Sequence, residues 1–201
     1  MKNNLFLVFL FFNSAIVCAQ GDWRLKGFIG LSNAALLDKK GYVGGASSDV
    51  TDFYELGMRI QHKWDSKWSW EAGLSYGFGQ IRTFQGTPGT NPFPGSGNFG
   101  EAPADFRLLS VPVLASYQLF DFLALKAGPM VSFQLSDFPT TKQSGLGYLI
   151  GLNLNFEREK FGLFLQPNFK RHASVSFDQS GRRLTELGFQ VGIAIPIFAE
   201  E

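Results

Sequence analysis

The last strand-like stretch of the chain, residues 185–197, alternates strictly between large apolar side chains and small or polar ones. One set of alternate positions holds Leu187, Phe189, Val191, Ile193, Ile195 and Ile197; the other holds Glu186, Gly188, Gln190, Gly192 and Ala194. Because successive side chains of a β-strand point to opposite faces, this pattern predicts a strand with one apolar face and one polar, small-residue face.

The same alternation recurs along the chain, and no segment after the first twenty residues shows a helical pattern. We expect strands at residues 23–33, 53–63, 68–79, 106–118, 122–135, 146–156, 161–171 and 185–197. Most are longer than strands of soluble domains and suit a tilted membrane crossing. A closed barrel is one of two structures that can cross a bilayer. The sequence therefore predicts an all-β fold, an eight-stranded antiparallel up-and-down transmembrane β-barrel.

The connections between these strands alternate in length. Residues 34–52 and 80–105 form long loops, 136–145 and 172–184 form medium ones, and 64–67, 119–121 and 157–160 form short turns. Short turns at one end and longer loops at the other are typical of bacterial outer-membrane barrels, whose short turns are periplasmic. The run Gly95–Gly100 matches the dinucleotide fingerprint, but no strand precedes it and no helix follows, so we interpret it as external loop.

Alternation alone does not say which face is outside, since a soluble carrier barrel has its apolar face inward. Charges on the polar face favour an interior where they pair, and we expect a lumen charge network of Lys26, Glu55, Arg59, Glu71, Lys126, Lys170 and Glu186. Aromatic residues also cluster at both strand ends, as the two membrane interfaces require. At the short-turn end these are Trp23, Trp64, Trp68, Trp70, Tyr117, Phe120, Phe156, Phe161 and Phe198. At the long-loop end they are Phe53, Tyr54, Phe78, Phe106, Phe133, Tyr148 and Phe169.

The N-terminus has the pattern of a secretory signal peptide. Lys2 precedes a short apolar run, and Val17 and Ala19 suit positions −3 and −1 of a cleavage site. We therefore expect a signal peptide at residues 1–19 and a barrel domain at residues 20–201. A lipoprotein cleavage before Cys18 is the alternative, which the size of Val17 disfavours.

Removal of this segment takes away its single charge and the single cysteine of the chain. The remaining chain has equal numbers of basic and acidic residues, which gives no support for a nucleic-acid partner. A disulfide framework, a thiol catalyst and a cysteine-ligated zinc site are excluded.

Two charge pairs should be neighbours across hairpins: Arg59 with Glu71, and Lys170 with Glu186. An eight-stranded barrel has room inside for little more than side chains, so we interpret the network as structural ion pairs. A narrow gated pore is the alternative.

One constellation suggests an enzyme: His172, Ser174 and Glu186 could supply base, nucleophile and orienting carboxylate for acyl transfer. This arrangement resembles the H-x-S…E pattern of the lipid A 3-O-deacylase family, which is also an eight-stranded outer-membrane barrel. That family has Asn after the serine, whereas Val175 stands here. The parity of the strands also directs His172 and Glu186 into the lumen, away from a lipid substrate.

His62 lies far from His172 in the sequence and is expected at the membrane interface, so we expect no metal site and no cofactor.

Two segments, Leu108–Leu114 with its internal Pro112 and Leu125–Pro129, together with the alternating final strand, resemble the PorT-like outer-membrane β-barrel family. The resemblance spans nearly the whole mature chain. It implies an integral protein of a Gram-negative outer membrane; some relatives assist protein secretion or gliding, but the family does not define one role. We expect a structural or interaction role, such as assistance to secretion or another envelope function, without catalysis. Its partners would be outer-membrane lipid and envelope proteins, reached through loops 34–52 and 80–105.

Pro112, Pro129 and Pro167 are expected to mark bulges or local bends in their strands.

Overall fold

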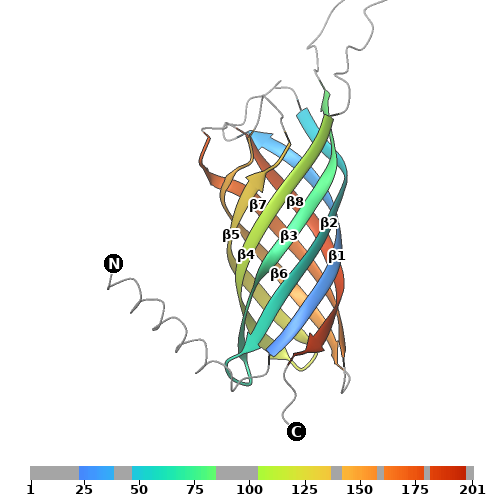
Figure 1. Cartoon of the computed structure of the whole chain (residues 1–201), viewed down its shortest axis with the longest axis vertical. Helices are drawn as coiled ribbons and strands as arrows, with labels where there is room; N and C mark the ends of the chain where they lie inside the picture. The colour runs from blue at the N-terminus through green and yellow to red at the C-terminus, as the bar shows by residue number, and fades with distance from the viewer. Residues whose placement is uncertain are drawn as a thin grey trace, which may run out of the picture.

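A computed structural model describes residues 23–38, 47–84, 104–136, 142–157, 161–178 and 182–197 (Figure 1). The expected signal peptide, the Gly95–Gly100 run and Phe198 lie outside the described residues. The strands are β1 (Trp23–Asp38), β2 (Ser47–Lys63), β3 (Trp68–Phe84), β4 (Ala104–Phe120), β5 (Leu123–Gln134), β6 (Gly145–Glu157), β7 (Gly162–Ser176) and β8 (Arg182–Pro196).

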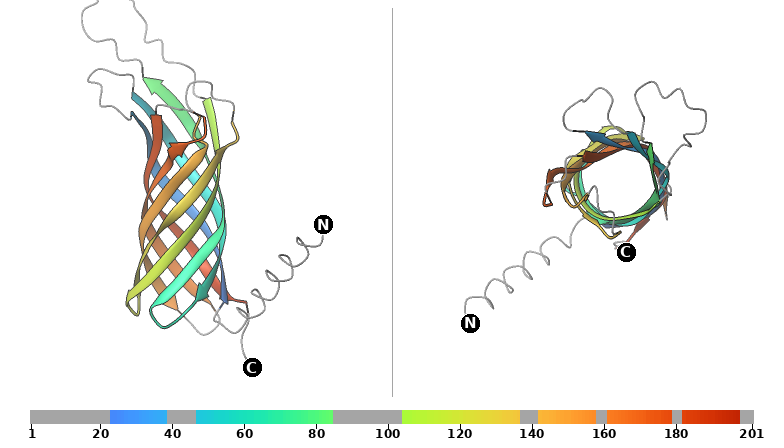
Figure 2. Two further views of the ribbon diagram at one scale, coloured as in Figure 1. Left: turned by 90° about the vertical axis from the view of Figure 1, so that its left-hand side faces the viewer. Right: turned by 90° about the horizontal axis from the view of Figure 1, so that it is seen from above.

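The strands form a closed barrel in chain order, and every neighbouring pair is antiparallel. Closure is made by β1 and β8, which pair from Arg24 with Pro196 to Asp38 with Arg182. Figure 2 shows the resulting cylinder from the side and from above. Every described strand is paired on both sides, so this sheet has no open edge. The predicted eight-stranded antiparallel barrel is confirmed.

The strands are longer at the long-loop end than predicted. β1 continues to Asp38 and β2 begins at Ser47, so the expected loop 34–52 is largely strand; β3 and β4 likewise shorten the loop 80–105 to residues 85–103. These extensions include Ser47, Ser48 and Asp49, which carry no apolar alternation, so hydropathy gave no signal for them. Among the described residues, no helix is long and apolar enough to span a membrane.

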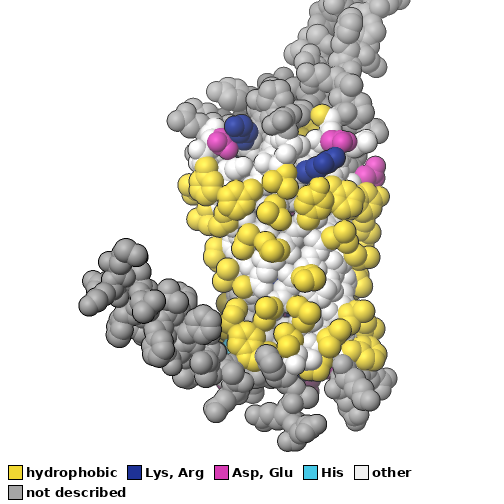
Figure 3. Space-filling view, in the orientation of Figure 1, with side chains coloured by type: hydrophobic (Ala, Val, Ile, Leu, Met, Phe, Trp, Pro, Cys, Tyr) yellow, Lys and Arg dark blue, Asp and Glu magenta, His cyan; other side chains and the backbone are white. Residues whose placement is uncertain are grey.

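Apolar side chains face outward over the middle of the wall. Ile29, Met58 and Leu187 are 60–68% exposed, whereas Lys26, Glu71 and Lys126 are at most 2% exposed. On the face seen in the space-filling view, apolar side chains cover the wall of the barrel, with charged side chains above them at the long-loop end (Figure 3). The structure thus turns the apolar faces outward and the charged faces into the lumen.

Aromatic contacts mark both edges of this outward-facing apolar band. At the short-turn end Trp23 stacks on His62 with 4.4 Å between ring centroids, and Trp70 packs against both rings. At the long-loop end Tyr54 stacks on Phe78, and Tyr148 lies beside Phe169 on the other side of the barrel. Aromatic pairs at both edges of an apolar band are the arrangement that the sequence predicted for two membrane interfaces.

Two residues predicted in the outer aromatic belt lie inside the lumen instead. Phe53 and Phe106 are 2% and 0% exposed, with their ring centroids 6.1 Å apart. Phe53 precedes the outward-facing Tyr54, and Phe106 lies between the exposed Asp105 and Arg107. Because adjacent strand residues face opposite sides, only one of each pair could belong to the belt.

The irregularities of the sheet do not coincide with its prolines. The register is unchanged across Pro112, Pro129 and Pro167, so no bulge lies there, although the pairing is interrupted for two residues beside each proline. The prediction of bulges or local bends was therefore wrong for the bulges. Register shifts lie instead at Asp52 in β2, against both β1 and β3, at Gln118–Phe120 in β4, and where β7 passes Ala173. Asp52 and Ala173 have positive φ angles of 52° and 46°, as a residue that opens a bulge often does.

Candidate functional site

Charged side chains in the lumen gather in two clusters. The lower cluster, towards the short turns, consists of Lys26, Arg59, Glu71 and Lys126, from β1, β2, β3 and β5. The upper cluster consists of Glu55, Lys170, His172 and Glu186, from β2, β7 and β8. The seven residues of the predicted network are therefore all buried inside, and His172 joins them.

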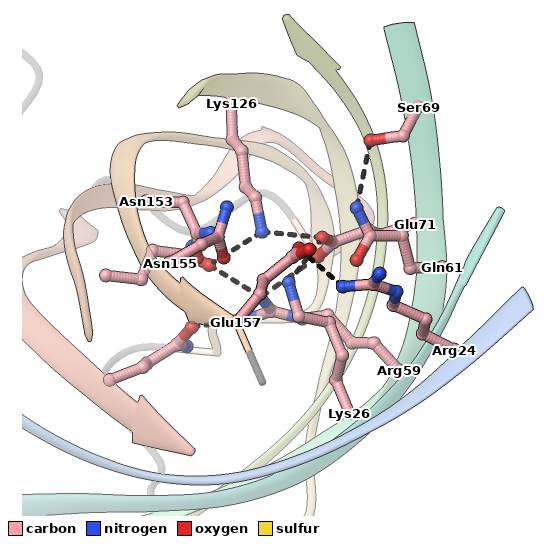
Figure 4. A network of polar contacts seen from close by, with 12 residues as sticks. Arg24, Lys26, Arg59, Gln61, Ser69, Glu71, Lys126, Asn153, Asn155 and Glu157 are labelled. Carbon is pink, nitrogen blue, oxygen red and sulfur yellow. Dashed lines mark hydrogen bonds and ion pairs between the residues drawn. The ribbon is translucent and has the colours of Figure 1, made fainter. Parts of the chain in front are cut away.

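Glu71 is the centre of the lower cluster (Figure 4). Its Oε1 accepts from the Nζ atoms of Lys26 at 2.9 Å and Lys126 at 2.5 Å. Arg59 Nη1 lies 3.8 Å from its Oε2. Three cations thus converge on one carboxylate in a region that water does not reach, where such pairing is required for charges to be tolerated.

Aromatic rings pack against the same cations. Lys26 Nζ lies 4.5 Å from the centroid of Phe164, and the guanidinium carbon of Arg59 lies 4.3 Å from the centroid of Phe28. The Phe28 ring can lie flat on the wall because Gly57 faces it: a Cβ there would be 2.2 Å from the ring. The wall is therefore shaped to receive the rings that stabilise the buried positive charge.

Gln166 extends the lower cluster, and Gln190 connects it to the upper one. Arg59 donates to Gln166 at 3.2 Å and to Gln190 at 2.8 Å, and Gln190 donates to Glu55 at 2.6 Å. Lys170 then donates to Glu55 at 2.7 Å and to Glu186 at 3.1 Å. A continuous chain of polar contacts runs along the lumen and crosses it repeatedly.

His172 and Glu186 meet as the enzyme alternative requires, but Ser174 does not join them. His172 Nε2 lies 2.6 Å from Glu186 Oε1, and its Nδ1 lies 2.8 Å from the hydroxyl of Ser132. Ser174 is exposed, because the bulge at Ala173 buries two consecutive residues and turns the next one outward. Ser132 is itself 0% exposed and hydrogen-bonds to Ser110, so the hydroxyl next to the histidine has no access to a substrate.

An apolar cluster, which the sequence reasoning missed, lies above the charged ones. It is formed by Ala34, Leu36, Phe53, Ile81, Phe106, Leu108 and Leu184. The signal was available in β4, where Phe106 and Leu108 alternate with the charged Asp105 and Arg107. At this level of the barrel Asp105 and Arg107 face outward, whereas Phe106 and Leu108 fill the lumen.

Polar side chains surround the lower opening of the lumen. Arg24 pairs with Glu157, Asn153 donates to Asn155, and Gln61 donates to Ser69 at 3.0 Å (Figure 4). Among the residues that the structure describes, no group of three or more His, Cys, Asp or Glu could hold a metal ion.

The burial of polar side chains in the lumen shows how tightly it is filled. Glu71, Gln166 and Glu186 are 0% exposed, and they lie at successive levels of the barrel. A continuous water column would leave their polar atoms accessible. Side chains therefore close the lumen at the level of both clusters.

No protein-family model matches the chain, and no curated protein matches it. Among solved structures it is similar to the outer-membrane protein OprG from Pseudomonas aeruginosa, with a TM-score of 0.53 and 14% identity, over 89% of this chain and 97% of that one. It is also similar to the outer-membrane protein AlkL in DMPC lipid bilayers, with a TM-score of 0.53 and 11% identity, over 90% of this chain and 94% of that one. At these identities the likeness shows the fold, which is that of small outer-membrane barrels.

Proposed function

We propose that the chain is an integral protein of a Gram-negative outer membrane. Residues 1–19 act as a signal peptide that is removed, and residues 20–201 form the inserted barrel. The outward apolar band, the aromatic residues at both its edges and the fold of outer-membrane barrels support this proposal.

Substitution of a band residue tests the insertion. Ile193 lies on β8 within the band, so Ile193→Arg should lower the free energy of unfolding from lipid vesicles by about 2–4 kcal/mol. Val175→Arg, close to the long-loop end of β7, is the matched control and should cost about 0–1 kcal/mol. Equal, small effects of both would contradict the orientation, and recovery of the mature protein in the periplasmic soluble fraction would exclude membrane insertion altogether.

The barrel itself has a structural or interaction role, not that of a pore or a catalyst. The observation that carries this proposal is the burial of the charged lumen: Glu71 and Glu186 are 0% exposed and held by ion pairs. Side chains that occupy the lumen leave no path for a solute, and the wall then serves to hold the loops at the membrane surface.

Conductance in planar bilayers tests the closed lumen. The purified barrel should give no ohmic conductance under conditions in which a general porin does. Glu71→Ala, which removes the centre of the lower cluster, should raise the frequency of current steps if the cluster forms the seal. Steady ohmic steps from the unmodified protein would favour the pore alternative.

Membership of the PorT-like family is part of the proposal, on the basis of the Leu108–Leu114 and Leu125–Pro129 segments. It implies that the connections at the long-loop end contact an envelope protein. Cross-linking followed by gentle solubilisation should recover that protein with the full chain and not with a variant whose residues 85–103 are replaced by a short Gly-Ser linker. Recovery with both would place the contact elsewhere.

The absence of catalysis is tested with purified lipid A. We expect no release of fatty acid, because His172 is turned into the lumen and Ser132 beside it is inaccessible. Release that Ser174→Ala abolishes would establish the deacylase alternative with His172, Ser174 and Glu186.

A further inference from the structure

Two grooves lie side by side on the outer wall near the long-loop end. One, of about 280 Å³, lies over β8, β1 and β2; the other, of about 380 Å³, lies over β2, β3 and β4. Asp52 and Tyr54 line both, so they form a ridge between the two grooves. Together the grooves cover five adjacent strands of the barrel.

A bulge in β2 lies between the two grooves. The register of β2 shifts at Asp52 against both neighbours, because β2 has one residue more than β1 and one more than β3 at this point. Asp52 takes a positive φ of 52°, a conformation that costs free energy for a residue with a side chain, and its carboxylate is exposed. Bulges commonly redirect a side chain in this way beside a functional site.

The larger groove combines an aromatic platform with charged groups. Tyr54 and Phe78 stack at 5.7 Å with an interplanar angle of 25°, and both are about 40% exposed. Asp52, Asp105 and Arg107 line the same groove, and Arg107 lies 3.7 Å from Asp105. Figure 3 shows charged side chains of both signs gathered immediately above the apolar band in this part of the wall.

This combination identifies the kind of ligand. Flat aromatic faces bind the C–H faces of a pyranose ring, and carboxylates accept hydrogen bonds from hydroxyl groups. The two carboxylates exceed the single guanidinium by one negative charge, which disfavours a phosphate group. A volume of a few hundred Å³ lined by both aromatic and polar side chains suits a small polar ligand.

We propose that the two grooves bind the uncharged sugar residues of a glycolipid headgroup in the outer leaflet, with Tyr54 and Phe78 as the stacking platform and Asp52 as the central hydrogen-bond acceptor. The grooves lie where the apolar band ends, which is the level of the headgroups. This inference rests on the proposed insertion in an outer membrane with the long loops outside.

Binding to defined vesicles tests the proposal. The full-length mature barrel is reconstituted in phosphatidylcholine vesicles with a trace of fluorescent lipid A that carries its core oligosaccharide, and bound glycolipid is measured by energy transfer from a dye on the barrel. Tyr54→Leu should weaken binding roughly tenfold, which corresponds to about 1.4 kcal/mol. Tyr54→Phe should retain it, and Asp52→Asn should weaken it.

A matched control lies on the opposite side of the barrel. Tyr148 of β6 forms an outer-belt pair with Phe169 of β7, at a centroid distance of 6.2 Å, so Tyr148→Leu removes a comparable ring and should leave binding unchanged. Equal losses in Tyr54→Leu and Tyr148→Leu would overturn the proposal, because they would indicate a general effect of the belt.

Competitors distinguish the source of the ligand. Unlabelled glycolipid should displace the probe, whereas a lipid A with the same acyl chains and no sugar beyond its phosphorylated disaccharide should displace it poorly; equal displacement would overturn recognition of the neutral sugars. Free core oligosaccharide should bind more weakly than the glycolipid, and equal affinity would overturn the assignment to a lipid headgroup. Flotation of every variant with the vesicles shows insertion separately, so loss of flotation counts against the membrane proposal and loss of binding alone counts against the grooves.

Discussion

Of the four residues of the lower cluster, Glu71 alone is negative, and three cations depend on it. Glu71→Gln leaves Lys26, Arg59 and Lys126 without their shared carboxylate in a region closed to water. Removal of one partner from a buried ionic group costs about 3–5 kcal/mol, so we expect a loss of that size in the free energy of unfolding, measured by urea titration in vesicles. Asp105→Asn, which breaks an exposed pair with Arg107, is the control and should cost about 0–1 kcal/mol. A similar small loss in both would show that the cations do not require Glu71.

The turn between β2 and β3 is held by Asp65. Its carboxylate accepts from the backbone N–H of Lys67 at 2.6 Å and of Trp68 at 2.7 Å, and these bonds hold the pKa of Asp65 below its usual value. A depressed pKa means that the folded state favours the ionised form, so this stabilisation is present above about pH 4 and is lost as the pH falls through the folded pKa.

Comparison of the wild type with Asp65→Ala measures this contribution. The melting temperature of the wild type should exceed that of the variant at pH 6, and the difference should shrink towards pH 2. A difference that is constant over this range would show that ionisation of Asp65 does not contribute. The effect is expected to be small, since the turn is exposed to solvent.

At the scale of elements, β1 and β2 are in close contact where the ring of Phe28 lies against Gly57. Phe28 and Gly57 are cross-strand partners, and a Cβ on Gly57 would meet the ring at 2.2 Å. Gly57→Ala should therefore lower the free energy of unfolding by about 1–3 kcal/mol. Gly27→Ala is the control on β1, because nothing lies within 4 Å of its new Cβ. Addition of Phe28→Leu should recover part of the loss, and strictly additive effects in this double-mutant cycle would contradict the close contact.

The strands show what the sequence could and could not predict. Alternation identified all eight, since a long run such as Leu187–Ile197 has no other simple interpretation. The assignment of Phe53 and Phe106 to the outer aromatic belt was wrong. It used only their positions near the strand ends and ignored that the adjacent Tyr54 and Arg107 face outward. The alternation correctly predicted that His172 and Glu186 face inward. The contact of His172 with Ser132 depends on β5 and β7 coming together across the lumen, and no local sequence pattern indicates such a contact.

The positions of the bulges could not be predicted from the sequence either. The register shifts near Asp52 and Ala173 arise from how the strands match around the circumference. Neither residue is a glycine or a proline, so the residue type gave no indication of a bulge. The prolines did not predict where the bulges lie. A proline lacks a backbone donor and so weakens one ladder, but a bulge requires an additional residue in one strand.

At the scale of the whole molecule, β1 and β8 are neighbours although they lie at opposite ends of the described chain. Their ladder is continuous over the length of both strands, so their amides should be as well protected from hydrogen exchange as those of β4 and β5. Exchange of the barrel in vesicles, followed strand by strand, measures this directly. Faster exchange confined to β1 and β8 would show that the barrel opens at that seam.

The charge chain in the lumen also bears on how such a barrel is built. Lys26 of β1 reaches Glu71 of β3, Lys126 of β5 reaches the same carboxylate, and Lys170 of β7 reaches Glu55 of β2. A half-assembled sheet would therefore present unpaired charges on one face while its other face is already suited to hydrocarbon. The pairs of Glu71 need only the first five strands, whereas the pair of Lys170 with Glu55 forms only when β7 has come round to β2. The ion pairs of the lumen thus connect the two ends of the chain as well as successive strands, and neutralisation of the upper cluster is completed only when the circle is closed.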